Sequence, residues 1–130
     1  MRSRRELPKP LTELSRDDLR VVLAAVETLI EFRDYLPPGG MLLMLAGRFR
    51  DDIRELLGMA TLGRVSRGPE RKMLSAMDDA DLARLSRAVV VLHPEYEDYI
   101  DDPEMVRLLA AVFGEVTVTV AGRMTGAKAS

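Results

Sequence analysis

The chain has 130 residues, and its 19 lysines and arginines against 21 aspartates and glutamates give a formal net charge of −2. It contains no cysteine, which excludes cysteine catalysis, thiolate metal sites and disulfide scaffolds. Hydrophobic residues make up 47% and charged residues 31% of the sequence. These proportions are typical of one ordinary soluble domain whose core needs neither a metal nor a disulfide.

The sequence predicts no membrane span and no signal peptide. The longest apolar runs, residues 21–26 and 41–46, are much shorter than the roughly 18 residues that a spanning helix needs. Arginines at positions 2, 4 and 5 are followed by Pro8, Lys9 and Pro10, where a signal peptide has its apolar stretch. We therefore expect a cytoplasmic protein that contacts no membrane, with an extended N-terminal arm over residues 1–10.

A first helix is predicted to begin after Ser15. Ser15, with Asp18 three residues later, resembles a capping box, in which the hydroxyl accepts a hydrogen bond from a backbone N–H of the first turn. Apolar residues then recur at intervals of three and four as far as Ile30, and Leu36 can extend this stripe. Two prolines and two glycines at 37–40 end the helix and predict a tight connection.

The segment from Met41 to Leu57 predicts a second helix, with Gly58 as its stop. Its first turns are apolar on nearly all sides, because Leu43 and Met44 widen the main stripe there. That end must be covered by more than one neighbouring element, in this chain or in another. The first two helices most simply form an antiparallel hairpin.

A basic linker over residues 60–72 follows, with no consistent hydrophobic period. A third helix is predicted after its N-cap Asp78, and Pro94 is expected to close it. An acidic segment over residues 95–104 then leads to Pro103, which favours the first turn of a fourth helix. The linker therefore joins two predicted hairpins.

The two halves of the chain align at an offset of 63 residues. This match indicates either an internal duplication or two uses of the same helix-start motif, and both origins predict the same two hairpins. The aligned pairs are Leu14 with Met77, Ser15 with Asp78, Asp18 with Asp81, Val22 with Leu85, Val26 with Val89, Leu29 with Leu92, Leu42 with Met105 and Leu45 with Leu108.

Residues 116–120 carry two conflicting patterns. Valines alternate strictly with threonines, all of them β-branched, between Gly114 and Gly122, which is typical of a strand. Val116 and Val120 also continue the apolar stripe of the fourth helix. We favour a helix, because a strand would need another subunit as its partner, while β-branching costs a helix only tenths of a kcal/mol per residue. The small, polar tail at 125–130 is expected to be disordered.

No constellation for catalysis, cofactor binding or metal binding emerges from the residues. His93 is the only histidine, and it lies where a helix is expected to end, a position that favours a cationic ring. The glycines at 58, 63 and 68 have the wrong spacing for a phosphate-binding loop, and the acidic segment lacks the glycine of a calcium loop. We therefore expect no enzyme activity, no cofactor, no metal and no small-molecule substrate.

The fold expected from these patterns is an all-α, four-helix domain made of two αα-hairpins joined by the basic linker. We expect it to act through protein contacts, as an assembly or structural subunit that forms a homo-oligomer or binds a protein partner. The expected interface combines the apolar start of the second helix with the C-terminal β-branched segment, namely Met41, Leu43, Met44, Val116, Val118 and Val120.

Segregated charges add candidate electrostatic contacts, because opposite patches on one molecule can join neighbouring copies head to tail. The basic candidates are Arg64, Arg67, Arg71 and Lys72. The acidic candidates are Glu95, Glu97, Asp98, Asp101, Asp102 and Glu104.

The alternative function is a small nucleic-acid-binding regulator that uses the N-terminal arginines and the basic linker. The net charge of −2 and the scarcity of aromatic residues disfavour it. Arginines at 48, 50 and 54 interleave with acids at 51, 52 and 55, and Arg48 with Asp52 predicts a surface ion pair rather than a recognition helix.

Overall fold

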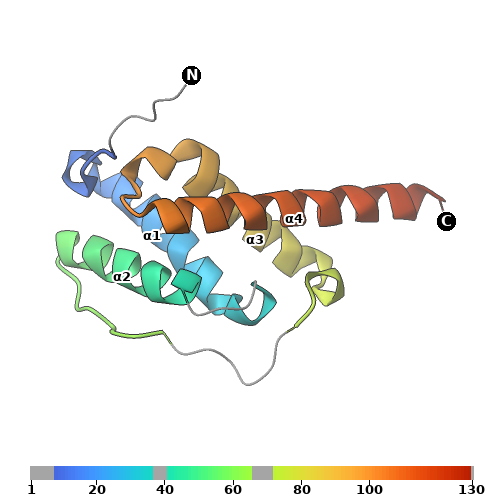
Figure 1. Ribbon diagram of the computed structural model, residues 1–130, viewed down its shortest axis with the longest axis horizontal. Coiled ribbons are helices and arrows are strands. Elements are labelled where there is room, and N and C mark those ends of the chain that lie inside the picture. The colour runs from blue at the N-terminus through green and yellow to red at the C-terminus, as the bar shows by residue number, and fades with distance from the viewer. Residues whose placement is uncertain (1–7, 37–40, 66–71, 130) are drawn as a thin grey trace.

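A computed structural model describes residues 8–36, 41–65 and 72–129, apart from the side chains of residues 41–42 and 125–129. Its four α-helices are α1 (Arg16–Glu31), α2 (Met41–Leu56), α3 (Asp79–Val90) and α4 (Pro103–Ala129). Helix α1 packs against α2 and α3, and α4 packs against α3 and α2. Figure 1 shows α4 running on past the other three helices. No strand occurs in the described residues, which confirms the all-α fold of two hairpins.

Both predicted helix starts are present and have the same structure. Ser15 Oγ accepts a hydrogen bond from the backbone N–H of Asp18 at 3.1 Å, and Asp78 Oδ1 accepts one from that of Asp81 at 2.8 Å. A short 3₁₀ turn precedes each cap, at Leu11–Glu13 (η1) and at Leu74–Ala76 (η3). These caps satisfy N–H groups that have no partner within the helix.

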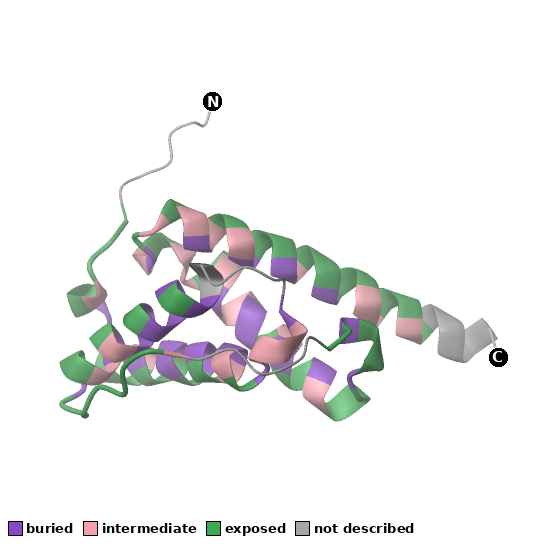
Figure 2. Cartoon of the chain, turned by 60° about the horizontal axis from the view of Figure 1, so that its bottom comes forward, coloured by how far each residue is buried: buried purple, intermediate pink, exposed green. Residues whose placement is uncertain are grey.

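The aligned apolar positions meet at the centre of the molecule. The pairs Val22 and Leu85, Val26 and Val89, and Leu29 and Leu92 are each at most 1% exposed. Figure 2 shows the buried residues gathered on the facing sides of the helices. A shallow groove on the seam between α1 and α3 is lined by four further pairs at the same offset, namely Val21 with Arg84, Ala24 with Arg87, Ala25 with Ala88 and Thr28 with Val91. The two hairpins are therefore related by a pseudo-two-fold arrangement.

Each half also binds the other through the segment before its first helix. The Lys9 N–H donates to the Asp98 carbonyl at 2.6 Å, and the Lys72 N–H donates to the Asp34 carbonyl at 2.8 Å. The Nζ atoms of the two lysines lie 5.7 Å from the ring centroids of Tyr99 and Tyr35, respectively. In each contact, the segment before the first helix of one half is joined to the short turn that follows the first helix of the other half.

Helix α3 does not end at Pro94 as expected. It passes into a π turn at Val91–Glu95 (η4) that contains Pro94, and the Tyr96 N–H donates to the Val91 carbonyl at 3.0 Å. This wider turn holds one more residue than an α turn. The offset between equivalent residues accordingly rises from 63 to 64: the 3₁₀ turn Arg33–Tyr35 (η2) corresponds to Glu97–Tyr99 (η5).

Residues 116–120 are helical, as we favoured, because α4 continues through them. The helix also continues to Ala129, where a disordered tail was expected. Residues Met105, Leu109, Val112 and Val116 form its buried stripe, each at most 1% exposed. By length and composition alone, the stretch Pro103–Met124 could cross a membrane, with a mean hydropathy of 1.6 and 22% of the window buried. Charged residues interrupt this stretch, so it contains no uninterrupted apolar run long enough to predict a spanning helix.

We predict that Ser15→Ala and Asp78→Ala each lower the free energy of unfolding by about 0.5–2 kcal/mol, because each leaves a first-turn N–H without its side-chain acceptor. Urea denaturation followed by circular dichroism measures both effects. Ser75→Ala is the matched control, since Ser75 is exposed and its hydrogen bond to Arg123 uses the backbone carbonyl. Equal midpoints for the parent and both cap variants would contradict this account of the helix starts.

Candidate functional site

Helix α2 borders two cavities that have different linings. The helix stops at Gly58, whose φ of 78° is readily adopted by glycine, and the Met59 N–H donates to the Arg54 carbonyl at 2.8 Å. The chain then turns back along α2 over residues 59–65, which we call the return segment. In the first half of the chain, the return segment follows the second helix. In the second half, α4 instead continues as a long helix.

Charged side chains of α2 fasten the return segment. Asp51 accepts hydrogen bonds from the backbone N–H groups of Leu62 at 3.1 Å and Gly63 at 2.9 Å. Arg50, only 6% exposed, donates to the Gly63 carbonyl at 2.5 Å and to Asp51 at 3.0 Å. Burial alone would raise the pKa of Asp51, but the bonds from Arg50, Leu62 and Gly63 outweigh it and hold the pKa below its usual value.

A groove of about 620 Å³ lies between α2 and the return segment, and we call it the α2 groove. A Cβ atom built on Gly47 would lie 2.9 Å from Val65 Cγ2, so glycine at this position allows the return segment to approach closely. The groove combines apolar walls with two arginines. It is lined by Leu43, Met44, Gly47, Arg48, Asp51, Gly63, Arg64 and Val65.

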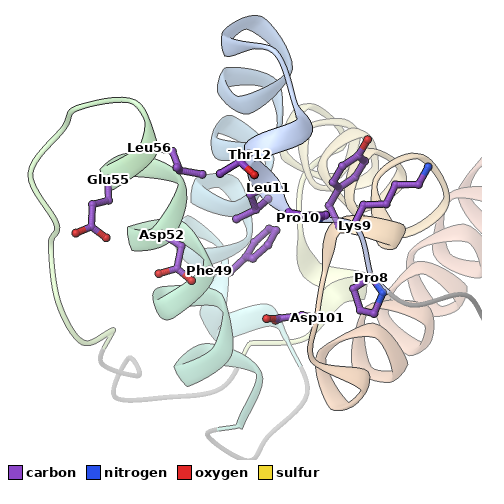
Figure 3. Close-up of a pocket in the computed structure, with 11 residues that line it drawn as sticks. Pro8, Lys9, Pro10, Leu11, Thr12, Phe49, Asp52, Glu55, Leu56 and Asp101 are labelled. Carbon is purple, nitrogen blue, oxygen red and sulfur yellow. The ribbon is translucent and has the colours of Figure 1, made fainter.

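A second cavity, of about 500 Å³, lies where the chain before α1 meets the C-terminal half of α2, and we call it the acid-rimmed pocket. Figure 3 shows the side chain of Phe49 facing the η1 turn, with Asp52 and Asp101 beside it. Most of the lining is apolar or aromatic, and three of the polar groups are carboxylates. It is lined by Pro8, Lys9, Pro10, Leu11, Thr12, Phe49, Asp52, Glu55, Leu56, Tyr99 and Asp101.

In the described part of the chain, no counterion contacts the carboxylates of the acid-rimmed pocket. Within the described residues, Asp52, Glu55 and Asp101 form no ion pair and their carboxylates accept no hydrogen bond. The expected ion pair between Arg48 and Asp52 is accordingly not formed. Asp52 is exposed as a whole residue, but desolvation of its carboxylate raises its pKa, the neighbouring charges of Asp101 and Glu55 raise it further, and Arg48 only partly opposes them. The pocket therefore has an excess of negative charge over an apolar floor.

Two of the predicted apolar interface residues are buried, and others are exposed. Leu43 is 6% exposed, whereas Met44 beside it is 46% exposed. Val116 is a core residue at 1% exposure, Val118 is 71% exposed, and Val120 packs against the core while remaining partly exposed. The side chain of Met41 lies outside the described residues. Met44 and Val118 therefore remain on the surface, but on different helices.

The predicted electrostatic residues also have separate roles. Arg64 lines the α2 groove, Lys72 lies over Tyr35, and Arg67 and Arg71 are outside the described residues. Asp102 caps α4 by accepting from the Glu104 N–H at 2.9 Å, while the Glu104 side chain pairs with Arg107 at 3.0 Å. Glu95 and Asp98 are exposed, and only Asp101 reaches the acid-rimmed pocket.

His93 contacts a carboxylate and an aromatic ring. Its Nδ1 lies 2.9 Å from Glu97 Oε1, although the direction of approach does not meet hydrogen-bond geometry. Its ring packs against Phe113 with centroids 5.4 Å apart. Among the described residues, no cluster of three or more His, Asp or Glu side chains could hold a metal ion.

Sequence reasoning missed the pocket residues Asp52 and Glu55, because their interleaving with arginines indicates a surface of mutual ion pairs. The signal available was the i, i+3 spacing of these two acids, which places both on one side of the helix. Comparisons with protein-family models, curated protein sequences and solved structures give no match.

We predict that Asp52→Asn makes the fold more stable than the parent at pH 7. The folded-state pKa of Asp52 lies above its usual value of 3.8, so the ionised carboxylate reduces stability as pH rises from 3.8 through the raised pKa. The difference between variant and parent should therefore shrink below about pH 4. Urea midpoints measured across this range test it. Asp17→Asn should have the opposite sign at pH 7, because it removes the pair with Arg20 at 3.3 Å.

Proposed function

We propose that the protein is a non-enzymatic assembly module that associates with further copies of itself through α2 and the return segment. The observation that carries this proposal is the concentration of large exposed hydrophobic side chains on these two adjoining elements. Met44 is 46% exposed, Leu56 39%, Met59 41% and Leu62 58%. Exposed apolar side chains gathered on neighbouring elements favour a protein interface, and methionines adapt well to such contacts.

The ordering of the return segment supports this function. Asp51, Arg50 and Arg54 hold it against α2, with Arg54 Nε donating to the Ala60 carbonyl at 2.6 Å. A segment that is ordered before binding loses less conformational entropy when it binds. The exposed side chains of Met59 and Leu62 are therefore presented to a partner on a fixed backbone.

Three described arginines outside the N-terminal arm and the basic linker are held in internal contacts, so they are not free to add phosphate contacts to the alternative, a nucleic-acid-binding regulator. Arg84 donates to Glu31 at 2.6 and 3.0 Å, Arg123 pairs with Asp79 at 2.7 Å, and Arg54 pairs with Glu27 at 3.2 Å. Each of these guanidinium groups would have to share or exchange its carboxylate in order to contact a phosphate. We therefore retain protein assembly as the proposed function.

Met44→Glu should weaken self-association by at least about tenfold, because a carboxylate without a partner is costly to bury at an apolar contact. Met44 is a better position than Leu43, whose burial means that a charge there would destabilise the monomer itself. Sedimentation equilibrium over a range of protein concentrations measures the change. Met73→Glu is the matched control, since Met73 is 64% exposed and lies outside α2 and the return segment. A parent that stays monomeric throughout would contradict the proposal.

Nucleic acid should not bind the parent tightly even at low salt. Fluorescence anisotropy with labelled duplex DNA and single-stranded RNA at about 50 mM salt tests this, because binding through phosphates is strongest at low ionic strength. Tight binding that falls steeply as salt rises would favour the regulator instead. Solution mass measured in the same buffer shows whether assembly occurs under those conditions.

A further inference from the structure

We infer that the acid-rimmed pocket of one copy receives the return segment of a second copy, with Arg64 placed among the pocket carboxylates. This inference rests on the proposed function, because it names the surface to which α2 and the return segment bind. The occupant it specifies is a cationic side chain next to apolar ones, supplied by another copy of this chain.

The pocket has the chemistry of a receptor for such a segment. Three carboxylates, of Asp52, Glu55 and Asp101, are in the lining with Lys9 as its one cationic residue. The Lys9 side chain lies over the ring of Tyr99 and extends away from these carboxylates (Figure 3). A guanidinium between unpaired carboxylates would form charge-assisted hydrogen bonds. The apolar part of the lining would meanwhile cover apolar side chains of the incoming segment, as in other binding pockets.

The return segment has the complementary chemistry. Arg64 is exposed and has no ion pair or hydrogen bond within the described residues. Met59 and Leu62 are 41% and 58% exposed on the same short segment. A cation and two large apolar side chains therefore stand on one ordered piece of backbone, and they match the carboxylates and the apolar floor of the pocket.

The two surfaces lie on different sides of α2, so the contact is head to tail. The α2 groove and the acid-rimmed pocket share no lining residue. A contact between unlike surfaces leaves an unused pocket on one copy and an unused return segment on the other. Such contacts therefore extend into rings or filaments.

Two charge reversals test the contact. Arg64→Glu reverses the return segment and leaves the pocket intact, while Asp52→Lys reverses the pocket and leaves the return segment intact. Each variant alone should associate at least about tenfold more weakly than the parent, since like charges then meet. An equimolar mixture should recover association, because the intact pocket of one variant can receive the intact return segment of the other, and the two reversed charges also meet with opposite signs. Analytical ultracentrifugation with one variant fluorescently labelled measures this association.

Controls keep the result specific to the pocket. Arg107→Glu and Glu115→Lys make the same kinds of charge change on exposed positions of α4, and each should keep the parent's mass distribution. Circular dichroism confirms that every variant is folded, and Asp101→Lys is a second pocket variant that should pair with Arg64→Glu in the same way. Raising the salt above about 0.1 M should weaken the parent's association, because exposed charges are then screened.

The outcomes separate this inference from the proposed function. If the parent associates while both single reversals keep its mass, the pocket contact is overturned and the proposed function stands. If both reversals abolish association but their mixture stays monomeric, the pairing of Arg64 with Asp52 is overturned. A parent that is monomeric at every concentration overturns the assembly function and this contact together. Association that is lost in each variant alone and recovered in their mixture supports the inference.

Discussion

The packing of α1 against α3 is the contact on which the rest of the fold depends. Val22, Val26 and Leu29 from α1 and their equivalents on α3 are almost completely excluded from solvent. Burying such side chains contributes roughly 1.5–3 kcal/mol each relative to exposure. The small pair Ala25 and Ala88, both 4% exposed, keeps the two helices close along this seam. Helices α2 and α4 then cover the remaining apolar sides of the central pair.

The pseudo-two-fold arrangement explains why the capping and crossing contacts occur twice. The 3₁₀ turns, the side-chain caps and the reciprocal bonds of Lys9 and Lys72 recur in both halves. The π turn at Val91–Glu95 is the point where the halves differ in length, and the buried residues Leu36 and Ile100, each beyond this point in its own half, correspond at an offset of 64. After the first helix region, the halves differ most in how their second helices end.

That difference creates the proposed assembly surfaces. In the first half, Gly58 turns the chain back and α2 acquires a fastened return segment, so Arg64, Met59 and Leu62 become surface groups of one ordered element. In the second half, α4 continues as a helix. The acid-rimmed pocket arises independently, where the chain before α1 meets α2 and brings Asp101 near Asp52. Helix α2 therefore has Arg64 of the return segment beside one cavity and the carboxylates of the acid-rimmed pocket beside the other.

The sequence by itself determined the helices, because caps, glycine and proline stops and three-to-four-residue spacing act over a few residues of chain. It indicated the helix starts at Ser15 and Asp78, the extent of α2 and the aligned core positions. Tertiary structure alone decided the π turn at Pro94 and the burial of Leu43 and Val116. It also decided which acids lack a partner: Asp52 lies four residues from Arg48 and pairs with nothing in the described chain, whereas Glu31 meets Arg84 from another helix. Local periodicity cannot specify such contacts, because they depend on how distant elements are brought together in space.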